Sequence, residues 1–170
     1  MVYKQSHFIL FIILFFVIAA THATLINAED NDISIIPYDE FVVEGISIGS
    51  TYDEVIKRLG KPVKVKKEII TGGAGLLVFY KGMDIVISGD ETVNISITGV
   101  GYKMKNGITI GSSRQEVFDK LGKAPEKMHR GRNTVRYTVL TPQGDYADAQ
   151  LIIRFKDSKV VEIVFFFDYV

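Results

Sequence analysis

The sequence predicts an α+β fold in which two tandem repeats, each a helix plus an antiparallel sheet, form one extended sheet with both helices on one face. One phrase occurs twice, at 45–62 and 107–125, and aligning Gly45 with Gly107 keeps the two copies in register at an offset of 62 residues. Short apolar runs follow each copy. Residues 92–98 alternate apolar and polar side chains, which is typical of a half-buried antiparallel strand.

The repeated phrase predicts a helix each time. Thr51 with Glu54, and Ser113 with Glu116, have the spacing of capping boxes, in which the hydroxyl accepts from a backbone N–H and the glutamate reaches back to the cap. Apolar residues four apart form one stripe on each helix, and a glycine followed by a proline ends it. Helices of about two to three turns do not persist alone in water, so each one implies a sheet to pack on.

Four strands are expected after each helix. They span 63–70, 75–80, 83–88 and 92–98 in the first repeat, and 126–130, 133–140, 149–155 and 160–169 in the second. A turn-rich insertion at 141–145 has no counterpart in the first repeat. Alternation in the last strand predicts that Val161, Ile163, Phe165 and Phe167 face the helices, whereas Val160, Glu162, Val164, Phe166 and Asp168 face the other way.

Residues 1–23 are predicted to be a signal peptide. Lys4 precedes an apolar run at 8–20, and small residues follow it. Cleavage is expected after Ala23, with cleavage after Ala28 as the alternative and an uncleaved membrane anchor as a third reading. The remaining chain divides into a linker and N-terminal extended segment at 24–44, repeat 1 at 45–106 and repeat 2 at 107–170.

Composition excludes several classes of function. The 20 basic and 20 acidic residues of the 170-residue chain create no global field that would attract nucleic acid. Cysteine is absent, which excludes disulfides, a thiol nucleophile and thiolate metal sites. His129 is the one histidine after the leader, and a plain surface histidine is favoured over a general base or a zinc ligand. No catalytic residue, metal or cofactor is therefore expected.

The doubled phrase, Gly-Ile-x-Ile-Gly followed by the capping box, Glu-Val, Leu-Gly and proline, resembles the β-lactamase-inhibitor-protein-like fold (BLIP-like) over about 45–170. It is also similar to the small outer-membrane assembly lipoproteins of the BamE/SmpA/OmlA type. The resemblance implies a binding module, because one branch inhibits β-lactamases through a concave sheet face and the other scaffolds barrel assembly. This chain lacks the disulfides of the first branch and the lipidated cysteine of the second, so the resemblance implies only the mode of action.

These observations predict an exported, non-catalytic protein-binding module of the bacterial cell envelope, periplasmic or extracellular, that docks a protein partner on the open sheet face. The residues expected to bind the partner are Arg136, Tyr146, Arg154, Glu162 and Phe166. No nucleic acid partner is expected, and membrane contact is expected only if the leader stays uncleaved. The alternative is an envelope hydrolase or small-ligand-binding protein that uses sheet-face carboxylates such as Glu162 and Asp168.

A basic run lies at 123–136. Its cations are Lys123, Lys127, Arg130, Arg132 and Arg136. Contact with anionic lipid, nucleic acid or peptidoglycan is one reading. The favoured reading is a solvated edge strand that cations guard against aggregation.

Overall fold

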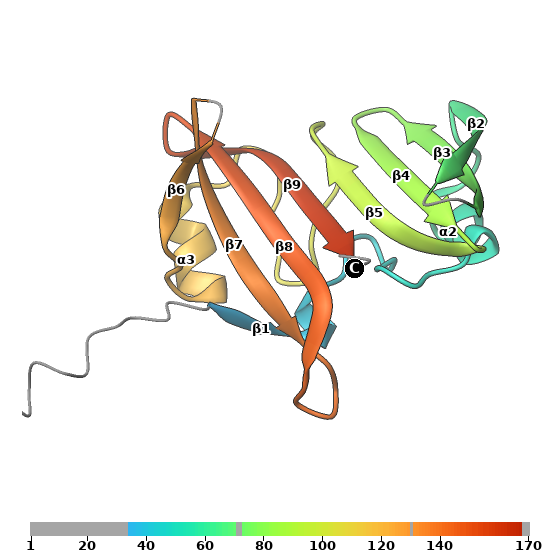
Figure 1. Cartoon of the computed structure of the whole chain (residues 1–170). Coiled ribbons are helices and arrows are strands. Elements are labelled where there is room, and N and C mark those ends of the chain that lie inside the picture. The colour runs from blue at the N-terminus through green and yellow to red at the C-terminus, as the bar shows by residue number, and fades with distance from the viewer. Residues whose placement is uncertain (1–33, 71–72, 130, 168–170) are drawn as a thin grey trace, which may run out of the picture. The chain divides into compact units, whose positions relative to one another are not determined.

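The computed structural model describes residues 34–70, 73–129 and 131–167, all of which belong to one unit that spans 33–170. In this part of the chain the elements are β1 (Ile35–Pro37), the 3-10 helix η1 (Tyr38–Glu40), α2 (Tyr52–Leu59), β2 (Lys64–Ile70), β3 (Gly73–Tyr80), β4 (Met83–Ser88), β5 (Glu91–Ile97), α3 (Arg114–Leu121), β6 (Glu126–His129), β7 (Arg132–Leu140), β8 (Tyr146–Lys156) and β9 (Lys159–Phe167) (Figure 1). The α+β class is therefore confirmed.

The described strands form a nine-stranded sheet in the order β1-β7-β8-β9-β5-β4-β3-β2. Strand β6 pairs with β7 next to β1, so these two short strands share one edge of β7. Pairing is antiparallel except between β1 and β7. The strands that follow α2 meet those that follow α3 where β5 pairs with β9.

Both helices begin at the predicted cap residues, but only α2 has the complete predicted capping box. Thr51 accepts from the Glu54 N–H at 3.3 Å, and Glu54 Oε2 accepts from the Thr51 N–H at 2.8 Å, which completes a capping box. Ser113 accepts from the Glu116 N–H at 3.1 Å. The Glu116 carboxylate also accepts from Lys120 Nζ at 3.0 Å, and this hydrogen bond is the largest cause of its lowered pKa. Glycines with positive φ cap both C-termini.

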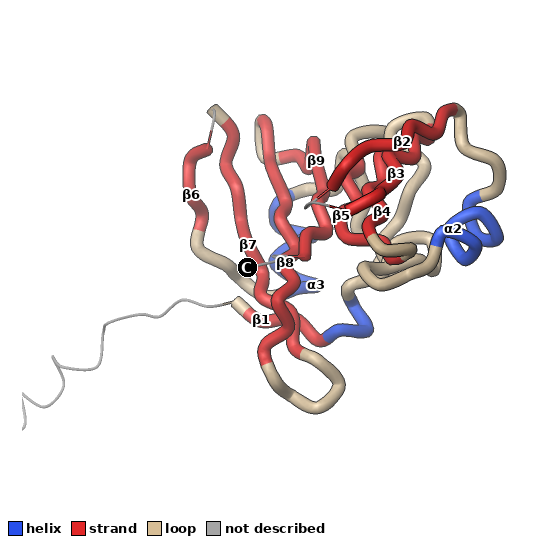
Figure 2. The backbone as a smooth tube through the Cα atoms, turned by 45° about the vertical axis from the view of Figure 1, so that its right-hand side comes forward, coloured by secondary structure: helices blue, strands red, loops and turns tan. Residues whose placement is uncertain are grey.

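One face of the sheet is the core. Neighbouring strands place apolar side chains opposite one another: Val135 with Ile153, Tyr137 with Leu151, Ile153 with Ile163, Leu151 with Phe165, and Phe165 with Ile95. Val55 of α2 and Val117 of α3 are fully buried in the same apolar cluster. Figure 2 shows α3 behind strands β7–β9. Alternation therefore leaves the opposite face of these strands pointing away from the helices.

The segments that lead into the two helices make the same backbone contacts. The Gly49 N–H donates to the Thr92 carbonyl at 2.8 Å, and the Gly111 N–H donates to the Val160 carbonyl at 2.8 Å. In both cases the N–H of the strand residue donates back to the carbonyl of the residue that follows the glycine, at 2.8 and 2.9 Å. These bonds fix each helix start against the second residue of β5 or of β9.

A tyrosine hydroxyl is bonded to the glycine that ends each helix. Tyr80 donates to the Gly60 carbonyl at 2.9 Å, and Tyr137 donates to the Gly122 carbonyl at 2.9 Å. Tyr137 is fully buried, and this burial raises the pKa of its hydroxyl. The two bonds tie β3 to the end of α2 and β7 to the end of α3.

We expect Tyr137→Phe to lower the free energy of unfolding by about 1 kcal/mol, because one hydrogen bond from a buried donor is lost. Urea unfolding of the full chain measures this change. Tyr80→Phe is the matched control: it removes the same type of bond from a more exposed tyrosine and should cost less. An equal or larger loss in the control would contradict the role assigned to burial.

Two expectations differ from the structure. Within the segment at 24–44, the polar residues 29–39, interrupted by Pro37, were expected to be the linker, but Ile35–Pro37 pairs with β7, and Ile36 is buried. Val160 was expected on the open face, yet it is buried opposite Phe155. The cause is a register shift after Arg154, which leaves Val161 as an extra residue in β9. Residues of β9 that precede Val161 therefore point to the side opposite to the one that simple alternation predicts.

Some expectations lie outside the described residues: the signal peptide at 1–23 with its cleavage sites, most of the linker, Arg130 and Asp168. Within the described ranges, no helix has the length and apolar character needed to cross a membrane.

Candidate functional site

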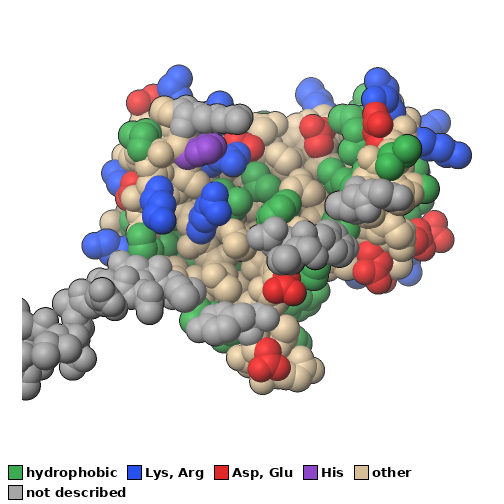
Figure 3. Space-filling model, in the orientation of Figure 1, with side chains coloured by type: hydrophobic (Ala, Val, Ile, Leu, Met, Phe, Trp, Pro, Cys, Tyr) green, Lys and Arg blue, Asp and Glu red, His purple; other side chains and the backbone are tan. Residues whose placement is uncertain are grey.

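The open face carries a cluster of basic side chains at its β6–β8 end. Register places Lys127 opposite Thr134, His129 opposite Arg132, Thr134 opposite Arg154, and Arg154 opposite Glu162, so all of these residues share one face. Arg136 lies two residues beyond Thr134 on the same side of β7. We call Lys127, His129, Arg132, Arg136 and Arg154 the basic cluster. Figure 3 shows Lys and Arg side chains beside the histidine on this face.

Four of the five residues expected to bind a partner share this face. Arg154 and Glu162 lie opposite each other on β8 and β9, Arg136 lies opposite Ile152, and Phe166 lies opposite Gln150. Arg136 is exposed, and Phe166 is half-buried. The fifth residue, Tyr146, begins β8, but its side chain is outside the described part of the structure.

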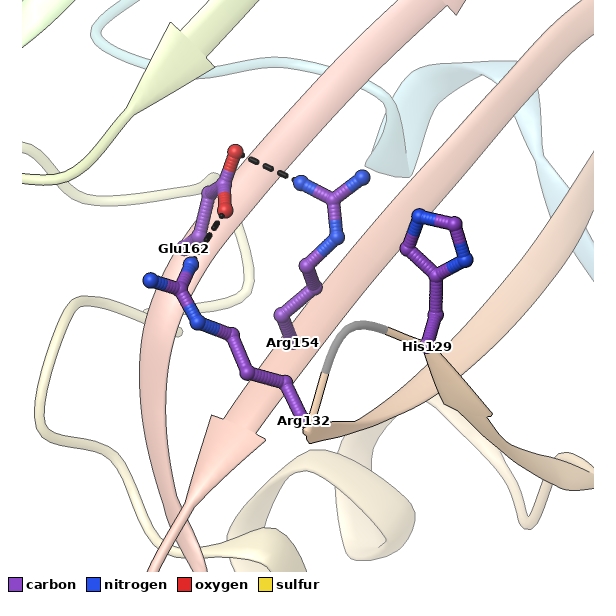
Figure 4. Close-up of a pocket in the computed structure, with 4 residues that line it drawn as sticks. All are labelled: His129, Arg132, Arg154 and Glu162. Carbon is purple, nitrogen blue, oxygen red and sulfur yellow. Dashed lines mark hydrogen bonds and ion pairs between the residues drawn. The ribbon is translucent and has the colours of Figure 1, made fainter.

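Glu162 is held between two arginines (Figure 4). Its Oε1 forms an ion pair with Arg154 Nη1 at 2.6 Å, and its Oε2 accepts from Arg132 Nη1 at 3.0 Å. The Glu162 side chain is only 16% exposed, so its charge needs such partners. Both carboxylate oxygens are therefore occupied by guanidinium groups.

A pocket of about 250 Å³ opens beside this ion-pair network, and its described lining consists of His129, Arg132, Arg154 and Glu162. Arg154 is 23% exposed, and its Nε is buried without a hydrogen-bond partner. Figure 4 shows the His129 ring across from the edge of Arg154 that carries this Nε. An unpaired donor therefore belongs to a residue that lines the pocket.

An apolar strip adjoins the pocket. Ile152 and Val164 lie opposite each other on β8 and β9, and both are nearly buried, at 8% and 9% exposure. Phe166 follows Val164 on the same side of β9. The face therefore combines an apolar centre, a half-buried aromatic ring and a charged border, a composition typical of protein interfaces.

Two residues that line the pocket, His129 and Arg132, were not predicted to belong to a site. His129 was interpreted as a surface histidine with no carboxylate nearby in sequence, and Arg132 as part of a solvated edge. Both are exposed, as that interpretation requires, but antiparallel pairing brings them to Glu162, 30 residues after Arg132. The signal that could have placed them is Gly131, since treating β6 and β7 as a hairpin pairs His129 with Arg132.

The described residues hold no group of three or more His, Asp or Glu side chains arranged to bind a metal ion. The pocket has one carboxylate, Glu162, among its described lining residues. The chemistry of the described pocket is therefore that of cationic donors.

No protein-family model matches the chain, and no curated protein matches it. Solved structures do. A cysteine-rich secretory protein from Staphylococcus aureus aligns with 79% of this chain and 49% of its own, at 16% identity and a TM-score of 0.52. An extracellular protein with an SCP domain from Bacillus anthracis aligns over 71% of this chain and 44% of its own, at 13% identity and a TM-score of 0.48.

A candidate β-lactamase inhibitor protein from Streptococcus mutans aligns with 66% of this chain and 79% of its own, at 16% identity and a TM-score of 0.31. At such identities the likeness concerns the fold alone, and of these three alignments only the one with the Staphylococcus aureus protein is close enough to support it. This chain spans less than half the length of the first two proteins. The resemblance to the inhibitor and BamE types remains a prediction.

Proposed function

We propose that the chain is an exported, non-catalytic module of the bacterial cell envelope that docks a protein partner on its open sheet face. The observation that carries the proposal is the face itself. Beside the ion-paired Glu162 it combines an exposed arginine, Arg136, with the half-buried ring of Phe166, on the side of β7–β9 that points away from α3. Aromatic and arginine side chains are the residue types most enriched in binding hot spots.

The proposal includes a duplication of one folding unit. The order helix, then four strands occurs twice in the described chain. Beyond the order, the contacts recur: a glycine before each helix bonds to the second residue of the last strand, and a tyrosine of the second strand bonds to the glycine after each helix. Two such units joined at their last strands give a sheet with both helices on the same side, which leaves the other side for a partner.

Export is supported by the leader-like composition of residues 1–23, with Lys4 before an apolar run and small residues after it. The secretory protein from Staphylococcus aureus, which has a similar fold, agrees with this location. We place the module in the periplasm or outside the cell.

The alternative, a hydrolase that uses sheet-face carboxylates, gains no support from the described face. Both oxygens of Glu162 already form ion pairs with guanidinium groups, at 2.6 and 3.0 Å. A catalytic acid or base needs a free oxygen directed at a substrate. The same ion pairs would serve a docking surface well, because they hold Arg132 and Arg154 in place before a partner arrives.

We expect Phe166→Ala to weaken partner binding by on the order of 2 kcal/mol, or about thirtyfold, because an aromatic ring at the centre of an interface is lost. The measurement is capture of partners from an envelope extract, followed by titration of the purified partner. Phe79→Ala is the matched control, since Phe79 is also half-buried but lies on β3, near the other end of the sheet. Equal affinity of wild type and Phe166→Ala would refute docking on this face.

A further inference from the structure

Arg154 pairs with Glu162 through one nitrogen and leaves another without a partner. Its Nη1 forms an ion pair with Glu162 at 2.6 Å, whereas its Nε is buried and has no hydrogen-bond partner. Nε and Nη2 form the edge of the guanidinium group that matches the two oxygens of a carboxylate. In Figure 4 this edge is turned towards His129 across the pocket. A buried donor without a partner costs free energy, and a ligand that accepts from it would recover that cost.

The charges of the pocket indicate what kind of ligand fits. Among the described lining residues, Arg132 and Arg154 carry positive charge and Glu162 carries negative charge, so the described lining is net positive. It therefore attracts an anion, and a carboxylate has the two oxygens that match the Nε–Nη2 edge of Arg154. Lys127 and Arg136 lie on the same face beside the pocket and would attract an acidic surface towards it.

We propose that this pocket binds an Asp or Glu side chain of the partner protein, with the carboxylate between Arg154 and His129. Arg154 donates from Nε and Nη2 to the two carboxylate oxygens, and a ring N–H of His129 donates to one of them. Arg132 does not touch the ligand but holds Glu162 by its second oxygen, at 3.0 Å, and so fixes the orientation of Arg154. The identification of the ligand as a group on a protein rests on the proposed function.

The volume of about 250 Å³ accommodates a side-chain carboxylate together with ordered waters, and the exposed position of His129 leaves an open side. The partner side chain would enter from the solvent at the β6 end of the face. Phe166 lies on the adjoining part of β9, so one partner surface could reach both sites.

The first experiment needs no partner. A blocked peptide with one Glu, acetyl-Gly-Glu-Gly-amide, is titrated at low salt into the full chain while the arginine Nε–H signals are followed by NMR. We expect a saturable shift of the Arg154 Nε–H signal with an affinity in the millimolar range, and no such shift with the Gln analogue. Equal shifts with both peptides, or tighter binding of inorganic phosphate than of the Glu peptide, would overturn the assignment.

Substitution of Arg154 separates the shape of the guanidinium group from its charge. Arg154→Lys keeps a cation beside Glu162 but loses the Nε–Nη2 edge, so peptide affinity should fall at least about tenfold. His129→Ala, at an exposed position, should weaken binding without affecting the fold. Arg114→Lys is the matched control, because Arg114 also makes one ion pair but lies on α3. Unchanged affinity in Arg154→Lys would refute the proposal.

The two proposals fail separately. If the Glu peptide does not shift Arg154 while Phe166→Ala still weakens partner binding, the docking face stands and the carboxylate pocket falls. If the peptide binds but Phe166→Ala has no effect on the partner, the pocket stands as a carboxylate site and docking across this face falls.

Discussion

Replacing Phe165 with alanine is expected to lower the free energy of unfolding by about 3–5 kcal/mol. The Phe165 side chain is fully buried, and its ring centroid lies 4.8 Å from that of Phe41. It lies opposite Ile95 on β5 and Leu151 on β8. It therefore packs where the strands that follow α2 meet the strands that follow α3. The cavity left by alanine would therefore weaken the junction of the sheet as well as the core. Urea unfolding of the full chain, monitored by circular dichroism, measures the loss.

The adjacent residue provides the control. Phe166 follows Phe165 on β9 but points to the open face and is half-buried, so Phe166→Ala should cost well under half as much stability. The same pair should behave in the opposite way in partner binding, where only Phe166 is expected to contribute. If Phe166→Ala proved as destabilising as Phe165→Ala, the assignment of the two faces of β9 would be wrong.

Local signals predicted most of the secondary structure. A capping box with a following glycine marks a helix by hydrogen bonds within a few residues, and both helices, Tyr52–Leu59 and Arg114–Leu121, lie where these signals place them. Met83–Ser88 was predicted with its exact bounds because turn residues flank it. Alternation also assigned Phe165 and Phe166 to opposite faces, and their burial agrees.

Features that depend on distant residues were not predictable in this way. Strand β1 pairs with β7, about a hundred residues later, and its three residues, two isoleucines and a proline, are too few to show alternation. The register shift after Arg154 places Val160 in the core, because counting by two fails across a bulge. Both features depend on which strands pair with each other, and a single sequence does not reveal that pairing.

The site was predictable only in part for the same reason. Arg154 and Glu162 were expected on one face because each strand alternates, and the structure pairs them directly. His129 and Arg132 enter the pocket through the β6–β7 hairpin, and neither is near Glu162 in sequence. A charge network between three strands is a property of the register, so residue types alone predicted only its members on β8 and β9.

Gly82→Ala is expected to destabilise the chain by about 2–5 kcal/mol, the sum of two separate effects. Gly82 has a φ of 84°, where a side chain adds strain. A Cβ built on Gly82 would also lie 2.4 Å from the Cα of Gly99, a backbone atom that has no side-chain freedom to move away. The Gly82 carbonyl accepts from the N–H groups of Thr98 and Gly99, both at 2.9 Å, so separating the two glycines would break these bonds. Thermal and urea unfolding measure the effect.

Gly89→Ala separates backbone strain from the clash. Gly89 also has a positive φ, 60°, and lies in a turn between two strands, but a Cβ there would have no atom within 4 Å. It should therefore cost only the strain, about 1–2 kcal/mol. Gly99→Ala tests the clash from the other side, because its added Cβ would lie 2.6 Å from the Gly82 Cα. If all three variants lost the same stability, the close approach of the two backbones would not be what requires glycine at positions 82 and 99.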